Sequence, residues 1–123
     1  MNNWTQDELQ RLAGTDDLHI SPLREDNLTY GTPTWIWSVV VGNKLFVRAY
    51  NGHASRWYKA AMRQKNGRIT AAGMTRDVMF RPADIEVQDA IDAAYRAKYG
   101  SSSYLKPMIG SQAQSATVEI SPR

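Results

Sequence analysis

The chain has 123 residues, of which 42% are hydrophobic and 22% charged, and it contains no cysteine. This length suits a single domain with a substantial core, and the absence of cysteine excludes disulfides, thiol catalysis and cysteine-ligated metal. No run of about 18 apolar residues argues for a membrane span, and the N-terminus lacks the pattern of a signal peptide. We therefore expect one cytoplasmic domain over residues 1–123 that does not associate with a membrane.

Charge is distributed unevenly along the chain. No acidic residue occurs at positions 27–76, called the basic stretch below, and this stretch contains eight bases: Lys44, Arg48, Arg56, Lys59, Arg63, Lys65, Arg68 and Arg76. Because the whole chain has 15 Lys and Arg against 12 Asp and Glu, seven bases and all twelve acids lie outside the stretch. Such an asymmetry indicates an anionic partner.

Capping and alternation predict the first elements. Thr5 and Glu8 have the spacing of a capping box, which predicts a short helix ending at Gly14. Residues 17–23 alternate in polarity and predict a strand that ends near Pro22.

Residues 34–41 and 44–50 predict two strands joined by a turn at Gly42-Asn43. This turn sets the register, so that Val41 faces Lys44 and the pairing continues outward. Side chains alternate across a strand, which gives the hairpin a small aliphatic face and a second, aromatic face. The aromatic face consists of Trp35, Trp37, Val39, Phe46, Arg48 and Tyr50.

A hairpin that is apolar on both faces needs two covers. We expect a flat ligand, a second subunit, or both to cover the aromatic face; alternatively, Trp37 and Arg48 form only a cross-strand stack worth about 0.5–1 kcal/mol. No acid occupies a neighbouring strand position, so the expected partner of Arg48 is a ligand phosphate or a carbonyl at the ligand edge. An acid from a distant part of the chain is the alternative.

A turn at residues 51–54 precedes a predicted helix that has Ser55 as its N-cap and runs to about Met62. The start of a helix offers free N–H groups and partial positive charge that suit a phosphate. Arg56 and Lys59 add formal charge. An ordinary solvated basic helix explains the same pattern.

The remaining elements are short strands at 68–72 and 75–81, a helix from Asp84 to Gly100, a helical or turn segment to about 110, and a last strand at 115–120. Six strands with inserted helices predict an α+β fold whose antiparallel sheet closes into a small barrel. Neither His19 nor His53 has a carboxylate near it in the sequence, and no metal-ligand or nucleophile motif occurs. Any chemistry is therefore expected to depend on an organic cofactor.

Four segments carry a resemblance to a known family: Pro33–Trp37, Lys44–His53, Ser55–Ala61 and residues 93–100. The chain resembles an uncharacterised bacterial family of small domains over nearly its whole length. That family is similar to the split-barrel flavin-binding proteins, which include pyridoxamine-phosphate oxidases and deazaflavin-dependent nitroreductases. Over about residues 30–80 the likeness to the nitroreductases is one of pattern.

The resemblance implies a six-stranded antiparallel split β-barrel with inserted helices and a homodimer with cofactor sites between subunits. It implies a phosphate-bearing ligand, either flavin mononucleotide or a deazaflavin coenzyme, and oxidoreductase activity. The residues that match by pattern, and that are predicted to contact the cofactor, are Thr34, Arg48, Tyr50, Asn51, Gly52, Arg56 and Trp57.

Two other functions are compatible with the sequence. Bases interleaved with aromatic residues suit a non-specific nucleic-acid binder, although the bases are spread over hairpin, helix and turn and no binding motif matches. The second of these functions is that of a homodimer that buries the aromatic face and binds no cofactor.

Overall fold

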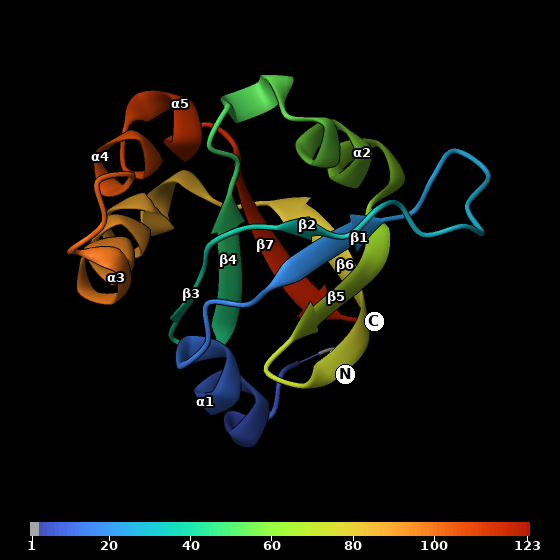
Figure 1. Ribbon diagram of the computed structural model, residues 1–123, viewed down its shortest axis with the longest axis horizontal. Helices are drawn as coiled ribbons and strands as arrows, with labels where there is room; N and C mark the ends of the chain where they lie inside the picture. The colour runs from blue at the N-terminus through green and yellow to red at the C-terminus, as the bar shows by residue number, and fades with distance from the viewer. Residues whose placement is uncertain (1–2) are drawn as a thin grey trace.

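The computed structural model describes residues 3–123 and contains one seven-stranded antiparallel sheet in the order β2-β1-β5-β6-β7-β4-β3 (Figure 1). The strands are β1 His19–Pro22, β2 Thr34–Trp35, β3 Ser38–Val41, β4 Lys44–Arg48, β5 Asn66–Ala71, β6 Met74–Pro82 and β7 Thr117–Pro122. The helices are α1 Gln6–Ala13, α2 Arg56–Gln64, α3 Gln88–Tyr99, α4 Leu105–Met108 and α5 Ser111–Gln114, with 3-10 turns η1 Gly52–Ala54 and η2 Ile85–Val87. The predicted α+β class is confirmed.

Helix α1 begins as the sequence predicts. The Thr5 hydroxyl accepts a hydrogen bond from the Glu8 N–H, and the Glu8 carboxylate accepts one from the Thr5 N–H. Both bonds of the capping box are therefore present, and the helix ends before Gly14.

The predicted six strands are seven, because residues 34–41 form two strands instead of one. Thr34 and Trp35 pair with β1, whereas Ser38–Val41 pair with β4. The two pieces thus lie at opposite edges of the sheet although only Ile36 and Trp37 separate them. The sequence gives no sign of this break, since residues 34–41 are a continuous run with high β-propensity.

This short connection makes the sheet curl. Seven strands spaced at 4.7–4.9 Å would put the edges of a flat sheet about 28 Å apart. Three residue steps, from Trp35 to Ser38, span about 11 Å at most. The edges must therefore approach each other, which produces a half-barrel compatible with a split barrel, and the segment β2–β3 crosses over its opening (Figure 1).

The hairpin register is as predicted, with Val41 opposite Lys44 and Val39 opposite Phe46. Its two faces enter two different hydrophobic clusters. Leu45 and Val47 belong to the main core inside the curled sheet, which also contains Leu9 and Leu12 of α1. Val39 and Phe46 belong to a second cluster formed with α3 and α4.

The cover of the aromatic face differs from the prediction. Helix α3 packs its residues Ile91, Tyr95 and Tyr99 over this face, so the chain itself covers most of it. Phe46 and Val39 are almost completely buried by this contact. The alternative, a stack of Trp37 on Arg48, is not formed either: Trp37 lies parallel to Tyr99 with ring centroids 4.0 Å apart, and the Arg48 guanidinium lies over Tyr95.

Candidate functional site

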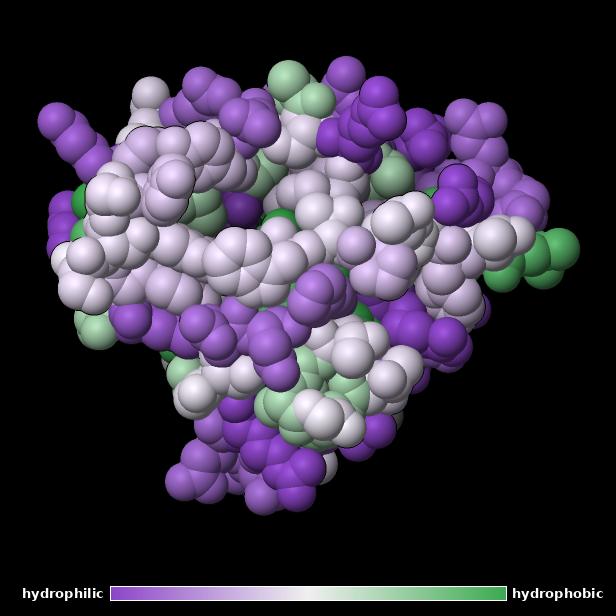
Figure 2. Space-filling model, viewed as in Figure 1, coloured by the Kyte–Doolittle hydropathy of each residue, from purple (hydrophilic) through white to green (hydrophobic). Residues whose placement is uncertain are grey.

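A cavity of about 610 Å³ opens where the C-terminal end of β4, the β2–β3 connection, the start of α2 and helix α4 meet. Figure 2 shows it as a hollow on the face of the molecule that Figure 1 presents. Its lining consists of Thr34, Trp35, Ile36, Trp37, Arg48, Tyr50, Asn51, Ser55, Arg56, Trp57, Tyr104 and Met108.

Five of the twelve residues that line the cavity are aromatic. Trp37 is held in place by its stack on Tyr99, and Trp57 projects from the first turn of α2. At the mouth Tyr50 and Tyr104 meet edge to face, with ring centroids 6.1 Å apart. Aromatic walls of this kind suit a flat ring, which gains both apolar burial and ring contacts.

The start of α2 contributes the polar side of the cavity. Ser55 is the N-cap with an extended backbone, but its hydroxyl forms no capping hydrogen bond. The first turn contains no acid, and Arg56 follows directly. Ser55 and Arg56 thus line the cavity at the start of a helix, a position where free N–H groups and positive charge suit a phosphate.

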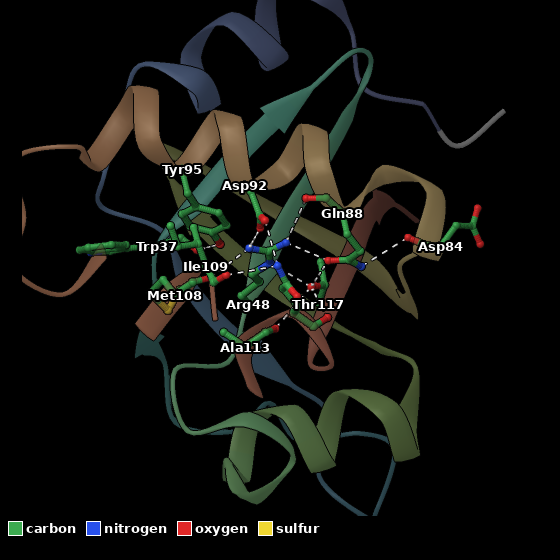
Figure 3. A network of polar contacts seen from close by, with 11 residues as sticks. Trp37, Arg48, Asp84, Gln88, Asp92, Tyr95, Met108, Ile109, Ala113 and Thr117 are labelled. Atoms are coloured by element: carbon green, nitrogen blue, oxygen red, sulfur yellow. Dashed lines mark hydrogen bonds and ion pairs between the residues drawn. The ribbon is translucent and has the colours of Figure 1, made fainter. Parts of the chain in front are cut away.

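Arg48 lies at the cavity wall, but its guanidinium forms its hydrogen bonds with other residues of the protein (Figure 3). Its Nη1 donates to the Asp92 carboxylate at 2.5 Å and to the Met108 carbonyl at 3.0 Å. Its Nε donates to the Thr117 hydroxyl at 3.0 Å, and its Nη2 donates to the side-chain and backbone oxygens of Gln88. A guanidinium has five N–H groups, so these five bonds use its whole capacity.

The expectation of a ligand partner for Arg48 is therefore wrong: its partner is Asp92, an acid from a distant part of the chain. The other carboxylate oxygen of Asp92 accepts a hydrogen bond from the Gln114 amide. The side chains of Arg48 and Asp92 are 0% and 12% exposed, which makes this a buried, fully hydrogen-bonded pair. Arg48 thus connects β4 to α3, α4 and β7 and fixes the wall of the cavity, leaving any phosphate contact to the α2 side.

The tyrosines around this pair are electrostatically perturbed. Burial raises the pKa of Tyr95 far above its usual value, although the Arg48 guanidinium, 5.3 Å from the ring centroid, acts in the opposite direction. Burial likewise raises the pKa of Tyr99 to about 12. Both rings are therefore neutral at ordinary pH and act as apolar supports for the cavity wall.

The structure brings six of the seven predicted contact residues to this one cavity; the exception is Gly52. Gly52 has φ +62°, and a Cβ atom added to it would lie 2.5 Å from Cγ of Gln112 on α5. It is needed for the turn and for the close approach of α5. The other six predicted residues thus share one cavity, Gly52 lies outside its lining, and their contact with a cofactor stays a prediction.

The residues that the sequence interpretation missed lie on α3, on α4 and at the N-cap of α4. Tyr104 and Met108 line the cavity, and Gln88 and Asp92 hold Arg48. Asp92 had a detectable signal, because it shares the buried face of α3 with Ile91, Tyr95 and Tyr99. An acid within an apolar helical stripe indicates a buried cationic partner.

The bases of the basic stretch fall into two groups. Four form ion pairs, each with an acid outside the stretch: Lys44 with Glu119, Arg48 with Asp92, Arg68 with Asp77 and Arg76 with Glu8, at 2.5–3.5 Å. The other four, called the α2 bases below, are Arg56, Lys59, Arg63 and Lys65. All four α2 bases are exposed, and none forms an ion pair with any residue of 3–123.

The part of the chain that the structure describes contains no group of three or more histidine and acidic side chains placed to hold a metal ion. None of the helices over residues 3–123 is long and apolar enough to cross a bilayer.

Fold and cavity together define a small α+β domain with a curled, half-barrel antiparallel sheet and one aromatic-lined site at its open end. Comparison with known protein families identifies one family to which the sequence matches over most of its length. The chain belongs to the family described as "Uncharacterized protein conserved in bacteria (DUF2255)", whose sequence profile matches residues 8–120. No curated protein matches the chain. The expected membership of an uncharacterised bacterial family is thus confirmed, and the relation to flavin proteins stays a prediction.

Proposed function

We propose that this protein binds a planar aromatic cofactor that carries a phosphate, with flavin mononucleotide as the first candidate and a deazaflavin coenzyme as the second. The observation that supports this most is the cavity itself. It joins three tryptophans to the α2 start, where Arg56 has no acid partner within residues 3–123. Ring and phosphate thus each have a matching surface in one cavity of about 610 Å³, within the range of small-molecule sites.

The lining residues favour flavin mononucleotide over a ligand with a long anionic tail. Arg48 also lines the cavity, but its charge is matched by Asp92. Arg56 is therefore the cation left for a ligand among the lining residues, and one guanidinium matches one phosphate. The approach to the hairpin, Leu28–Pro33, adds no base.

In this proposal the chain's residues bind and orient the cofactor. Trp37 and Trp57 hold the ring, and Ser55, Arg56 and the first N–H groups of α2 hold the phosphate. A flavin or deazaflavin supplies hydride or electron transfer when bound, and oxidoreductase activity is a further consequence to be tested once binding is shown.

The test is a set of titrations followed by tryptophan fluorescence, because three of the four tryptophans line the cavity. Flavin mononucleotide is expected to bind at least 10-fold more tightly than riboflavin, since a hydrogen bond to a charged group contributes about 1.5–3 kcal/mol. Arg56→Met should remove most of this difference and leave riboflavin binding unchanged. Arg96→Met, which removes an exposed base on α3 away from the cavity, is the matched control.

Equal binding of flavin mononucleotide and riboflavin would refute the phosphate site. If neither flavin binds, and the deazaflavin coenzyme does not bind either, the cofactor proposal fails as a whole. The absorbance spectrum of the purified protein gives the same information before any titration, because a retained flavin or deazaflavin is coloured.

Homodimerisation is the second part of the proposal. Helix α3 covers most of the aromatic face, so little of that face remains for a second subunit. The homodimer therefore depends on the resemblance to the split-barrel proteins, and we expect its interface to leave the aromatic rim at the cavity mouth open, where Trp35, Tyr50 and Tyr104 are 54%, 45% and 62% exposed. A monomer mass of 13.9 kDa in light scattering at micromolar concentration would exclude the dimer. The cytoplasmic location stays a prediction.

A further inference from the structure

The four α2 bases are concentrated on one short element. Arg56, Lys59 and Arg63 are spaced by three and four residues, which places them along one side of the helix. Seven residues at a rise of 1.5 Å each extend this row over about 10 Å. Lys65 continues it at the C-cap.

This arrangement is electrostatically unfavourable for the isolated chain. Arg56 lies in the first helical turn, where the helix dipole favours anions. Lys59 and Arg63 are a like-charged i,i+4 pair, which costs a few tenths of a kcal/mol. No acid lies on α2 to offset either effect, although each other base of the basic stretch is paired. An external anion with several charges would offset both.

The row begins at the aromatic cavity. Arg56 belongs both to the row and to the cavity lining, and the exposed rings of Trp35, Tyr50 and Tyr104 surround the same cavity. Positive charge along a line, followed by accessible aromatic rings, is the combination that binds single-stranded nucleic acid. An acidic peptide would use the charges and leave the rings unused.

We propose that this face binds single-stranded nucleic acid, with a base against the aromatic rim and successive phosphates along Arg56, Lys59 and Arg63. A strand stacked as in a duplex has one phosphate per about 3.4 Å, so a row of about 10 Å faces about three of them. Taken together, the eight bases of the basic stretch are spread over several elements, which argues against a nucleic-acid site. The four that form no ion pair, however, all lie on α2 and its C-cap.

The test uses a fluorescently labelled oligothymidylate and anisotropy titrations. Three phosphate contacts predict a slope of log affinity against log salt of about −2, or about 20-fold weaker binding at 200 mM than at 50 mM salt. A duplex of the same length should bind more weakly, because its bases are not available to the rim. Tyr104→Ala should weaken binding about 10-fold and leave the salt slope unchanged.

Charge reversal provides the matched comparison. Arg63→Glu should reduce affinity at least 10-fold and make the salt slope shallower, whereas Arg96→Glu, an equal charge change at an exposed helical position on α3, should leave both unchanged. Neither Lys59 nor Arg63 lines the cavity. The double variant Lys59→Glu/Arg63→Glu should therefore lose the oligonucleotide and keep its flavin affinity, so this proposal and the cofactor proposal can fail separately.

Three results would overturn the proposal. The first is no binding of the oligonucleotide at 50 mM salt. The second is equal loss of affinity in the Arg63 and Arg96 variants, which would show attraction by net charge alone. The third is equal affinity for single strand, duplex and an acidic peptide, which would identify the row as an unspecific anion-binding surface.

Discussion

The two groups of bases in the basic stretch lie in different surroundings, although the sequence shows them as one run of positive charge. Lys44, Arg48, Arg68 and Arg76 extend from strands of the sheet, and each meets an acid from the chain outside the stretch. The α2 bases extend from a helix and its cap and meet none within residues 3–123. Half of the charge asymmetry is therefore internal complementarity between distant segments, and half remains on the surface for a partner.

Arg48 is the extreme case of the first group. A buried ion pair compensates its desolvation only when the remaining hydrogen-bonding groups are also satisfied. Here the guanidinium and the carboxylate meet donors or acceptors from β4, β7 and the α3–α5 region (Figure 3). On the sheet side the chain thus satisfies its own charges, whereas on the α2 side it does not.

Removing Arg48 should give the largest effect on stability. Arg48→Met leaves the Asp92 carboxylate buried without its cation, which costs about 3–5 kcal/mol of unfolding free energy. Arg11→Met breaks an exposed i,i+4 pair with Asp7 and should cost only about 0.3–0.5 kcal/mol. Urea denaturation of both variants measures the difference.

A second substitution distinguishes charge from packing at this position. Arg48→Met/Asp92→Leu removes the unpaired carboxylate and should recover a large part of the lost stability, because apolar replacements of buried ion pairs are often neutral. If the double variant is no more stable than Arg48→Met, the stability depends on the hydrogen bonds of Arg48 to Gln88, Thr117 and Met108 instead.

The turn that joins the two regions should be the next most sensitive position. Gly52→Ala forces alanine to φ +62°, at about 1–2 kcal/mol, and also displaces Gln112, at about 1–3 kcal/mol. Gly42→Ala requires a nearly identical φ of +60° but meets nothing within 4 Å, so only the backbone cost applies. Thermal or urea unfolding should therefore show a clearly larger loss for Gly52→Ala, and equal losses would contradict the close approach of α5.

These examples also show which parts of the fold the sequence could predict. The hairpin register follows from a local turn and alternation, and the capping box of α1 from two residues three positions apart. Both depend on interactions near in sequence. The division of residues 34–41 between two sheet edges, and the cover of the aromatic face by α3, depend on pairing with segments far away.

The candidate site divides in the same way. Thr34 to Trp57 are close in sequence, and the structure brings most of the predicted residues to the cavity. Tyr104 and Asp92 come from the other end of the chain, where the sequence shows only a regular amphipathic helix and a polar turn. The expected partner of Arg48 was wrong for this reason: the acid within the apolar stripe of α3 indicates a buried cation but does not identify which one, because the pair spans 44 positions.

The stability of the sheet side, where Tyr95 and Tyr99 are buried, can also be tested at alkaline pH without a substitution. The pKa values of Tyr95 and Tyr99 are raised in the folded protein, the latter to about 12, from an ordinary value of 10.0. Their contribution to stability is therefore complete below about pH 10 and is lost as the pH rises toward 12. Lys98 acts in the opposite direction, because burial lowers its pKa and the penalty disappears as the lysine loses its proton.

We expect the urea midpoint to fall between about pH 10 and about pH 12, because three tyrosines with raised pKa values oppose one lysine with a lowered pKa. The third is Tyr30, whose pKa is raised by its hydrogen bond to Asp77. Tyr99→Phe should reduce the size of this fall, although it also removes two hydrogen bonds, one donated to the Ser38 carbonyl and one accepted from the Ser38 N–H. A midpoint that is constant over this range would show that the two tyrosine rings are less buried in solution.

The smallest stability effect is expected on the α2 side, where two N-caps can be compared. Thr5 forms both bonds of a capping box at α1, so Thr5→Ala should cost about 1 kcal/mol. Ser55 forms no capping bond at α2, so Ser55→Ala should change the unfolding free energy by less than about 0.5 kcal/mol. If the uncapped hydroxyl contacts a ligand phosphate, as the proposed function requires, Ser55→Ala should weaken flavin mononucleotide binding while Thr5→Ala leaves it unchanged. A large loss of stability in Ser55→Ala would instead show that the hydroxyl caps the helix in solution. The N–H groups at the start of α2 would then have a partner within the chain, as the charges on the sheet side do.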